Sequence, residues 1–90
     1  MDISEIRTQI DELDEKLLNI FNQRAHLALK LGEIKKEKDV AVYDPERERL
    51  IFERMKALNP GPLDDGAIVR LFERVIDESR RLERIRTKGK

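Results

Sequence analysis

Apolar residues recur at alternating intervals of three and four over the first third of the chain. They are Ile3, Ile6, Ile10, Leu13, Leu17, Ile20, Leu27, Leu31 and Ile34. Such intervals place the apolar side chains on one stripe of a helix. Because the repeat continues for four heptads, with no Pro or Gly before Gly32, it predicts one long helix over about residues 4–36.

Two shorter helices are predicted by their start and stop signals. Asp44 followed by Pro45 is typical of a helix N-terminus, since Asp caps free backbone N–H groups and Pro at the first position loses no hydrogen bond. This helix spans about residues 45–58, because Asn-Pro-Gly-Pro at 59–62 stops it. A third apolar stripe, from Ile68 to Leu82, predicts a helix over about residues 65–86. We therefore expect an all-α fold, with residues 1–90 forming a single domain of three helices.

The first predicted helix is too long for a compact monomer. Roughly 33 helical residues extend for about 50 Å, whereas a folded domain of this size is only about 30 Å across. Much of the apolar stripe would then face water in a lone chain. We therefore expect an intertwined helical homodimer, in which two copies bury the same surface about a two-fold axis.

Composition argues against several classes of function. Charged residues make up 42% of the chain, but 19 basic residues balance 19 acidic ones, and a net charge of zero argues against nucleic-acid binding. There is no Cys, and the one His, His26, falls on the polar side of the first helix, so no metal site is expected. No apolar run is long enough to cross a membrane. The chain opens without a signal-peptide pattern, so we expect a cytoplasmic protein.

Cationic residues interrupt the stripe of the first helix. Arg24 occupies a core position of the repeat, and Lys35, eleven residues later, lies about 20° away around the helix. These two cations should line one inward edge. Arg7 lies off that line and about 25 Å from Arg24 along the helix axis. It can join the other two only across a dimer.

The other two predicted helices carry polar residues on both faces. Those expected to lie inward are Arg47, Glu48, Ser79 and Glu83. Those expected to face outward are Arg49, Glu53, Lys56, Arg80, Arg81 and Arg84.

Each inward residue also has a purely structural explanation. Arg24 can fix the register of paired helices, and Lys35 compensates the dipole at a helix C-terminus. Asp44 caps a helix in any case, and Ser79 can bond to its own helix. Taken together, these structural explanations are less convincing, because the polar residues that break the apolar stripes all lie inward and share one chemistry. Several cations, one acid and small hydrogen-bonding groups suit a small dianion that bears a hydroxyl group.

With these residues in place, the sequence resembles the all-α (AroQ-class) chorismate mutases of the small bacterial type. The resemblance covers nearly all the chain and rests on RTQIDELDEKLLNIFNQRAHLALKLGEIK at 7–35, DPERER at 44–49 and RLFERVIDESRRLE at 70–83. The positions that match the family's site are Arg7, Arg24, Lys35, Asp44, Arg47, Glu48 and Ser79. One departure is Glu83, where many bacterial members have Gln.

The resemblance implies the rearrangement of chorismate to prephenate, in phenylalanine and tyrosine biosynthesis. This step is unimolecular and pericyclic, so no cofactor is implied. In the family's intertwined dimer, an arginine of the first helix reaches the partner's pocket, which implies that role for Arg7. Arg24 is then expected to clamp a carboxylate together with Arg7 of the partner subunit. Arg47 and Ser79 are expected to support this clamp.

The remaining roles implied by the resemblance concern the ether oxygen and the ring hydroxyl of chorismate. Lys35 and Glu83 are expected to donate hydrogen bonds to the ether oxygen. Glu48 and the backbone at Asp44 are expected to hold the hydroxyl. With Arg24, the pair Lys35 and Glu83 forms the expected catalytic group.

Two other functions stay open on the sequence. The same fold serves isochorismate-pyruvate lyases, which act on a near-identical dianion. A non-catalytic helical dimerisation or ligand-binding module is the second alternative. It would leave Arg24 and Lys35 uncompensated on an inward face, which is costly.

Overall fold

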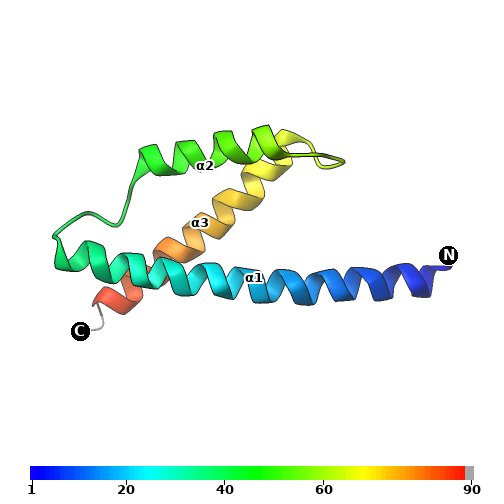
Figure 1. Cartoon of the computed structure of the whole chain (residues 1–90), viewed down its shortest axis with the longest axis horizontal. Coiled ribbons are helices and arrows are strands. Elements are labelled where there is room, and N and C mark those ends of the chain that lie inside the picture. The colour runs from blue at the N-terminus through cyan, green and yellow to red at the C-terminus, as the bar shows by residue number, and fades with distance from the viewer. Residues whose placement is uncertain (89–90) are drawn as a thin grey trace.

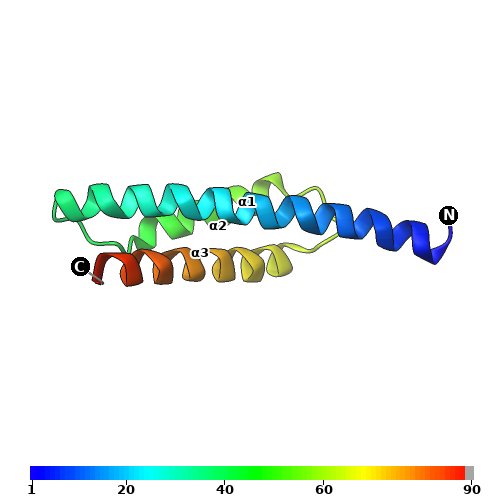
Figure 2. The same cartoon turned by 90° about the horizontal axis from the view of Figure 1, so that it is seen from below.

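The computed structural model describes residues 1–88, and these form three helices joined by two loops. Helix α1 spans Ile3–Glu37, α2 spans Pro45–Leu58 and α3 spans Asp65–Lys88. Figure 1 shows α2 running back above the C-terminal half of α1, with α3 running diagonally from the end of α2 toward the C-terminal end of α1. Figure 2 shows that α3 lies to one side of both helices. Helix α3 packs against both α1 and α2, so it holds the other two helices in place. The predicted all-α fold of three helices is confirmed.

Each helix begins at an Asp that accepts a hydrogen bond from a backbone N–H three residues later. Asp2 caps α1 by accepting from the N–H of Glu5 at 2.8 Å. Asp44 caps α2 by accepting from the N–H of Arg47 at 3.0 Å. Asp64 accepts from the N–H of Ala67 at 2.7 Å, at the start of α3. These bonds satisfy donors that a helix leaves unpaired at its first turn.

The loop between α1 and α2 turns sharply at the end of α1. Asp39 adopts a left-handed backbone conformation with a φ of 57°, which Asp tolerates better than most residues. The N–H of Val40 then donates to the carbonyl of Lys35 at 2.8 Å. This turn folds the loop back along the end of α1, toward the start of α2.

The chain by itself buries very little apolar surface. Ile76, 7% exposed, is the one large apolar side chain that counts as buried among the residues whose exposure is described. The predicted stripe of α1 stays largely open, with these side chains exposed: Ile3, Ile6, Ile10, Leu13, Leu17, Ile20, Leu27, Leu31 and Ile34.

The shape of the chain is correspondingly extended. It measures 54 × 27 × 14 Å, with a radius of gyration of 16.2 Å, against about 12 Å for a compact domain of this length. Figure 2 shows the N-terminal part of α1 reaching well past α3. No helix in the described part of the chain is long and apolar enough to cross a membrane.

Candidate active site

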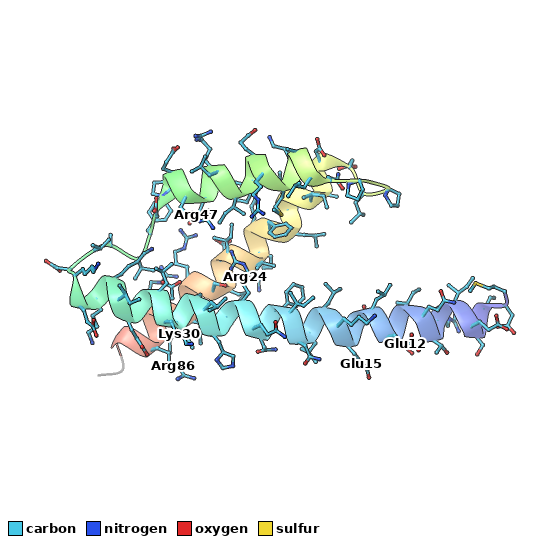
Figure 3. The ribbon with its side chains drawn as sticks, viewed as in Figure 1. Glu12, Glu15, Arg24, Lys30, Arg47 and Arg86 are labelled. Carbon is cyan, nitrogen blue, oxygen red and sulfur yellow. The ribbon has the colours of Figure 1, made fainter. Side chains whose placement is uncertain are left out.

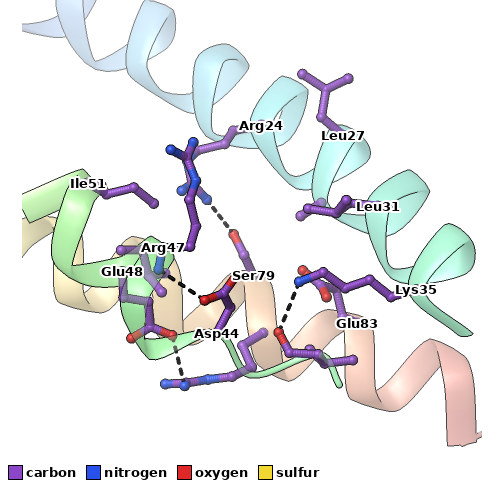
Figure 4. A pocket seen from close by; sticks show the side chains of 14 residues that line it. Arg24, Leu27, Leu31, Lys35, Asp44, Arg47, Glu48, Ile51, Ser79 and Glu83 are labelled. Carbon is purple, nitrogen blue, oxygen red and sulfur yellow. Dashed lines mark hydrogen bonds and ion pairs between the residues drawn. The ribbon is translucent and has the colours of Figure 1, made fainter. Parts of the chain in front are cut away.

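A cavity of about 260 Å³ opens between the C-terminal half of α1, the start of α2 and the C-terminal half of α3 (Figure 4). Its polar lining residues are Arg24, Lys35, Asp44, Arg47, Glu48, Ser79, Arg80 and Glu83. Its apolar walls come from Leu27, Ala28, Leu31, Val42, Ile51 and Ile76. Every site residue expected from the sequence, except Arg7, therefore lies around one cavity.

Arg24 enters the cavity from α1 and is tied to α3. Its Nη1 donates to Ser79 Oγ at 3.0 Å, across the gap between the two helices. Figure 3 shows Arg24 and Arg47 pointing into the space between the helices, whereas Glu12 and Glu15 point away from it. A guanidinium held by one hydroxyl keeps further N–H groups available for an anionic ligand.

Lys35 also enters the cavity from α1, eleven residues after Arg24. Its Nζ donates to the backbone carbonyl of Val42 at 3.2 Å, which fixes the loop over the end of the cavity. An ammonium group has three N–H donors, so Lys35 can donate to a ligand as well as to Val42. The bond uses a loop carbonyl that the sequence pattern did not identify.

Glu83 faces Lys35 from α3 and is deeply buried, with 7% of its surface exposed. Burial raises the pKa of the Glu83 carboxyl above its ordinary value, and the positive charges of Lys35 and Arg24 only partly oppose this shift. A carboxyl group with a raised pKa keeps its proton to higher pH and can then donate a hydrogen bond.

Gly32 of α1 provides the space that Glu83 occupies. A Cβ atom at Gly32 would lie 3.2 Å from Glu83 Cγ and 3.3 Å from Glu83 Oε2. The two helices approach so closely here that any side chain at this position would press on the carboxyl group. The sequence pattern gave no reason to assign Gly32 a role.

The start of α2 places three polar residues at the cavity. The Asp44 cap fixes the first turn, and this turn directs Arg47 and Glu48 toward α1 and α3. Arg49, on the opposite face, is exposed and pairs with Glu46 at 2.7 Å. Arg47 and Glu48 therefore line the cavity and Arg49 faces away from it, as expected for these three residues.

Arg80 corrects one expectation from the sequence. We expected it to face away from the cavity, but it lines the cavity wall and is only 23% exposed. Its Nη1 donates to Glu48 Oε2 at 3.0 Å. A signal was present in the sequence, because Ile76, Arg80 and Glu83 follow the i, i+4, i+7 spacing of a single helix face.

Arg7 does not line the cavity and is exposed near the far end of α1. This position agrees with the expectation that it cannot join Arg24 within one chain. Arg7 therefore contributes nothing to the cavity of its own chain.

The cavity lining carries excess positive charge. Four cationic and three acidic side chains line it, which gives a net charge of +1, or +2 when Glu83 is protonated. Among the described residues, no group of three or more His, Asp or Glu side chains is placed to hold a metal ion. The arrangement suits a small anion with two negative charges and a polar group facing Glu48.

Comparison with known proteins assigns the family. The model of the family described as chorismate mutase type II matches residues 6–84. The chain belongs to this family. Among its relatives, the chorismate mutase of Methanocaldococcus jannaschii is 32% identical over 83 residues, which cover 91% of this chain and 84% of the relative.

Other chorismate mutase relatives differ in length or include a ligand. The bifunctional chorismate mutase/prephenate dehydratase of Aquifex aeolicus is 37% identical over 87 residues, but the chain spans only 24% of that relative's length. The crystal structure of the chorismate mutase from Helicobacter pylori in complex with prephenate has a TM-score of 0.88 and 28% identity. That match covers 96% of this chain and 93% of the Helicobacter chain.

Proposed function

We propose that this chain catalyses the rearrangement of chorismate to prephenate. The observation that carries the proposal is the cavity, which gathers Arg24, Lys35 and Arg47 around one small space with a net positive lining. The substrate is a small dianion, and the reaction is unimolecular, so positioning and electrostatics suffice without a cofactor. The prephenate complex of the Helicobacter relative supports the same choice of ligand.

The carboxylates of the substrate are assigned to the arginines. Arg24 is held by Ser79 at 3.0 Å, so its guanidinium is oriented before the substrate arrives. Arg47 projects from the capped first turn of α2 into the same cavity. Bidentate contacts from such forks fix the orientation of a carboxylate as well as its position. This orientation selects the compact conformer in which the two reacting carbons meet.

The ether oxygen of the substrate is assigned to Lys35 and Glu83. During the rearrangement a C–C bond forms while the ether C–O bond breaks, and negative charge develops on the departing oxygen. Lys35 donates from α1, and Glu83 donates from α3 in its protonated form, which burial favours. A preorganised donor at such an oxygen contributes about 3–4 kcal/mol to catalysis.

The ring hydroxyl of the substrate is assigned to the N-terminus of α2. Glu48 lines the cavity and accepts hydrogen bonds, and the backbone at Asp44 adjoins it. The hydroxyl distinguishes chorismate from a plain dicarboxylate. Glu48 is therefore assigned to substrate selection rather than to the breaking bond.

We further propose that the active form is a homodimer with two composite sites. The open apolar stripe of α1 supports this, because a second copy would cover it and bring Arg7 of the partner subunit to each cavity. We propose that residues 1–90 act as one domain and work in the cytoplasm.

The test is incubation of the purified protein with chorismate while its loss and the formation of prephenate are followed. Rapid conversion, above the uncatalysed background, is the expected result. A parallel incubation with isochorismate measures pyruvate release. Pyruvate release without prephenate formation would replace the proposal with a lyase, and no turnover of either substrate would leave a ligand-binding module.

A further inference from the structure

Among the described residues that line the cavity, Arg80 is the one cation to which the proposed reaction assigns no role. It projects from α3 and contacts two carboxylates and one aromatic ring. Its Nη1 donates to Glu48 Oε2 at 3.0 Å, and its Nη2 donates to Asp77 Oδ1 at 2.7 Å. Its guanidinium carbon lies 4.8 Å from the centre of the Tyr43 ring. Arg80 thus joins α3 to α2 and to the loop before α2.

We propose that Arg80 is a positioning residue that fixes Glu48 as the acceptor for the ring hydroxyl of the substrate. This inference rests on the proposed function and extends it to Arg80, which acts on the substrate through Glu48. The bond from Arg80 engages Oε2 of Glu48, and a carboxylate has a second oxygen that remains to accept from a ligand. In Figure 4 a dashed line marks the bond that the labelled Glu48 accepts from this guanidinium.

The geometry of Arg80 suits a fixed orientation. Glutamate has a flexible side chain, and no bond from α2 itself holds the Glu48 carboxylate among the described contacts. Asp77 holds the second nitrogen of the Arg80 fork one turn earlier on α3, so the fork is itself anchored. Tyr43 stacks against the guanidinium, which restricts its remaining motion. A guanidinium held in one orientation also restricts the orientation of the carboxylate that it binds.

Arg80 also resolves an electrostatic conflict in the cavity. A carboxylate needed as a hydroxyl acceptor would repel a dianionic substrate at close range. Glu48 and Arg80 are only 21% and 23% exposed, so their charges are less screened than those of a surface pair. The positive charge of Arg80 compensates Glu48, while the acceptor oxygen is retained.

The alternative is that this ion pair only stabilises the fold, and a double-mutant cycle separates the two roles. Arg80→Ala, Glu48→Gln and the double variant are compared by kcat/KM for chorismate, with melting temperature measured on each. We expect Arg80→Ala to reduce kcat/KM by about tenfold, as a lost positioning contact does, but to add less than about twofold in the Glu48→Gln background. An equal loss in both backgrounds would refute the inference.

Two further variants serve as controls for the cycle. Arg81→Ala removes the next cation on α3. The Arg81 side chain is 66% exposed, and its Nη1 lies 3.8 Å from Glu78 Oε1. This variant should leave kcat/KM unchanged. Arg80→Lys keeps the charge without the fork, so we expect it to restore the KM more than the kcat. It also keeps the test decisive if Arg80→Ala does not fold. Full restoration of both constants by Lys would refute a positioning role.

A chorismate analogue that lacks the ring hydroxyl gives the closing test. If Arg80 acts through Glu48 on the hydroxyl, Arg80→Ala loses activity toward chorismate but loses little toward the analogue. Equal losses for both substrates overturn the inference while leaving the proposed function intact. A wild-type chain that leaves chorismate unchanged refutes the proposed function, and the inference falls with it.

Discussion

The acid at position 83 stands where the proposed chemistry needs a hydrogen-bond donor. An ionised carboxylate has no proton to donate and would repel the oxygen on which charge develops. Burial is the main reason that the pKa of Glu83 is raised, and the cations around it only reduce the shift. The negative charges of a bound substrate would raise this pKa further. The neutral acid is therefore the form that can work.

The first prediction is that Glu83→Gln flattens the fall in activity at alkaline pH. In the wild type, kcat/KM should be higher on the acid side and decrease as pH rises through the pKa of Glu83 in the free enzyme. Gln provides an N–H donor that does not titrate, so the variant should be more active than the wild type at pH 8. Initial rates between pH 5 and pH 9 measure both profiles. Identical profiles would show that Glu83 is not the donor.

Melting temperature gives an independent check on the same carboxyl group. Because folding raises the pKa of Glu83, the protonated form favours the folded state at low pH, and this contribution is lost as pH rises through the folded pKa. We expect Glu83→Gln to melt higher than the wild type at pH 8, with a smaller difference at pH 4. A constant difference would contradict the raised pKa.

The second prediction concerns the two cations of α1. Arg24→Ala and Lys35→Ala should each reduce kcat/KM by about a hundredfold or more, on the scale of losing one oxyanion donor. Arg49→Ala is the matched control, because Arg49 is exposed on the outer face of α2 and pairs with Glu46. Steady-state kinetics with chorismate measure all three. Comparable losses at Arg49 and Arg24 would show that the assignment of the cavity is wrong.

Single residues show how far the sequence predicts the site. Arg24 and Lys35 were identified because a charge within an apolar stripe is costly unless it has a partner or a ligand. Arg80 was expected to face outward although it shares a helix face with Ile76 and Glu83. Its carboxylate partner comes from α2, 32 residues earlier in the chain, and helix periodicity carries no information about that contact.

At the scale of elements, helix bounds follow from local rules and loop contacts do not. The Asp caps and the Pro at the start of α2 act within one turn, so the sequence defines where each helix begins. The carbonyl of Val42 reaches Lys35 only because the loop turns at Asp39. Likewise, the close approach of α1 and α3 at Gly32 depends on how two helices pack, which no single helix specifies.

The third prediction is that Gly32→Ala lowers activity without lowering stability. Ala is favoured over Gly within a helix by about 1 kcal/mol, but its Cβ would press on Glu83 Cγ, only 3.2 Å away. A small displacement of a catalytic group is costly, so we expect kcat/KM to fall about tenfold while the melting temperature is maintained or rises. Kinetics and thermal unfolding measured by circular dichroism check the two effects.

Two controls show whether Gly32→Ala acts through Glu83. Gly66→Ala makes the same change in the first turn of α3, away from the cavity, and should leave activity unchanged. In a Glu83→Ala background, Gly32→Ala should have little further effect, because the group that it displaces is gone. An undiminished loss in that background would mean that the glycine serves the packing of α1 alone.

At the scale of the whole molecule, the residues of one chain whose exposure is described bury almost no apolar core. Ile76 is its one large apolar side chain that is buried in the part of the chain whose exposure is described. The radius of gyration of 16.2 Å is also too large for a compact domain. The sequence predicted this deficit, because a stripe four heptads long cannot be covered by two shorter helices. The geometry of the second copy is not specified by the stripe, since one apolar face permits several registers.

The fourth prediction is that the sites are shared between two chains. Arg7→Ala and Arg24→Ala should each be nearly inactive as pure proteins, and the wild type should sediment as a dimer at micromolar concentration. In a heterodimer of the two variants, one cavity combines an intact Arg24 with Arg7 of the partner subunit, and the other lacks both. Random exchange of equal amounts makes about half of the dimers mixed, so about a quarter of the wild-type activity should return.

Subunit exchange is verified first with two differently tagged chains. Once exchange is demonstrated, a mixture that stays inactive means that Arg7 acts within its own chain or has no part in the site, and a folded, active monomer would exclude the shared site altogether.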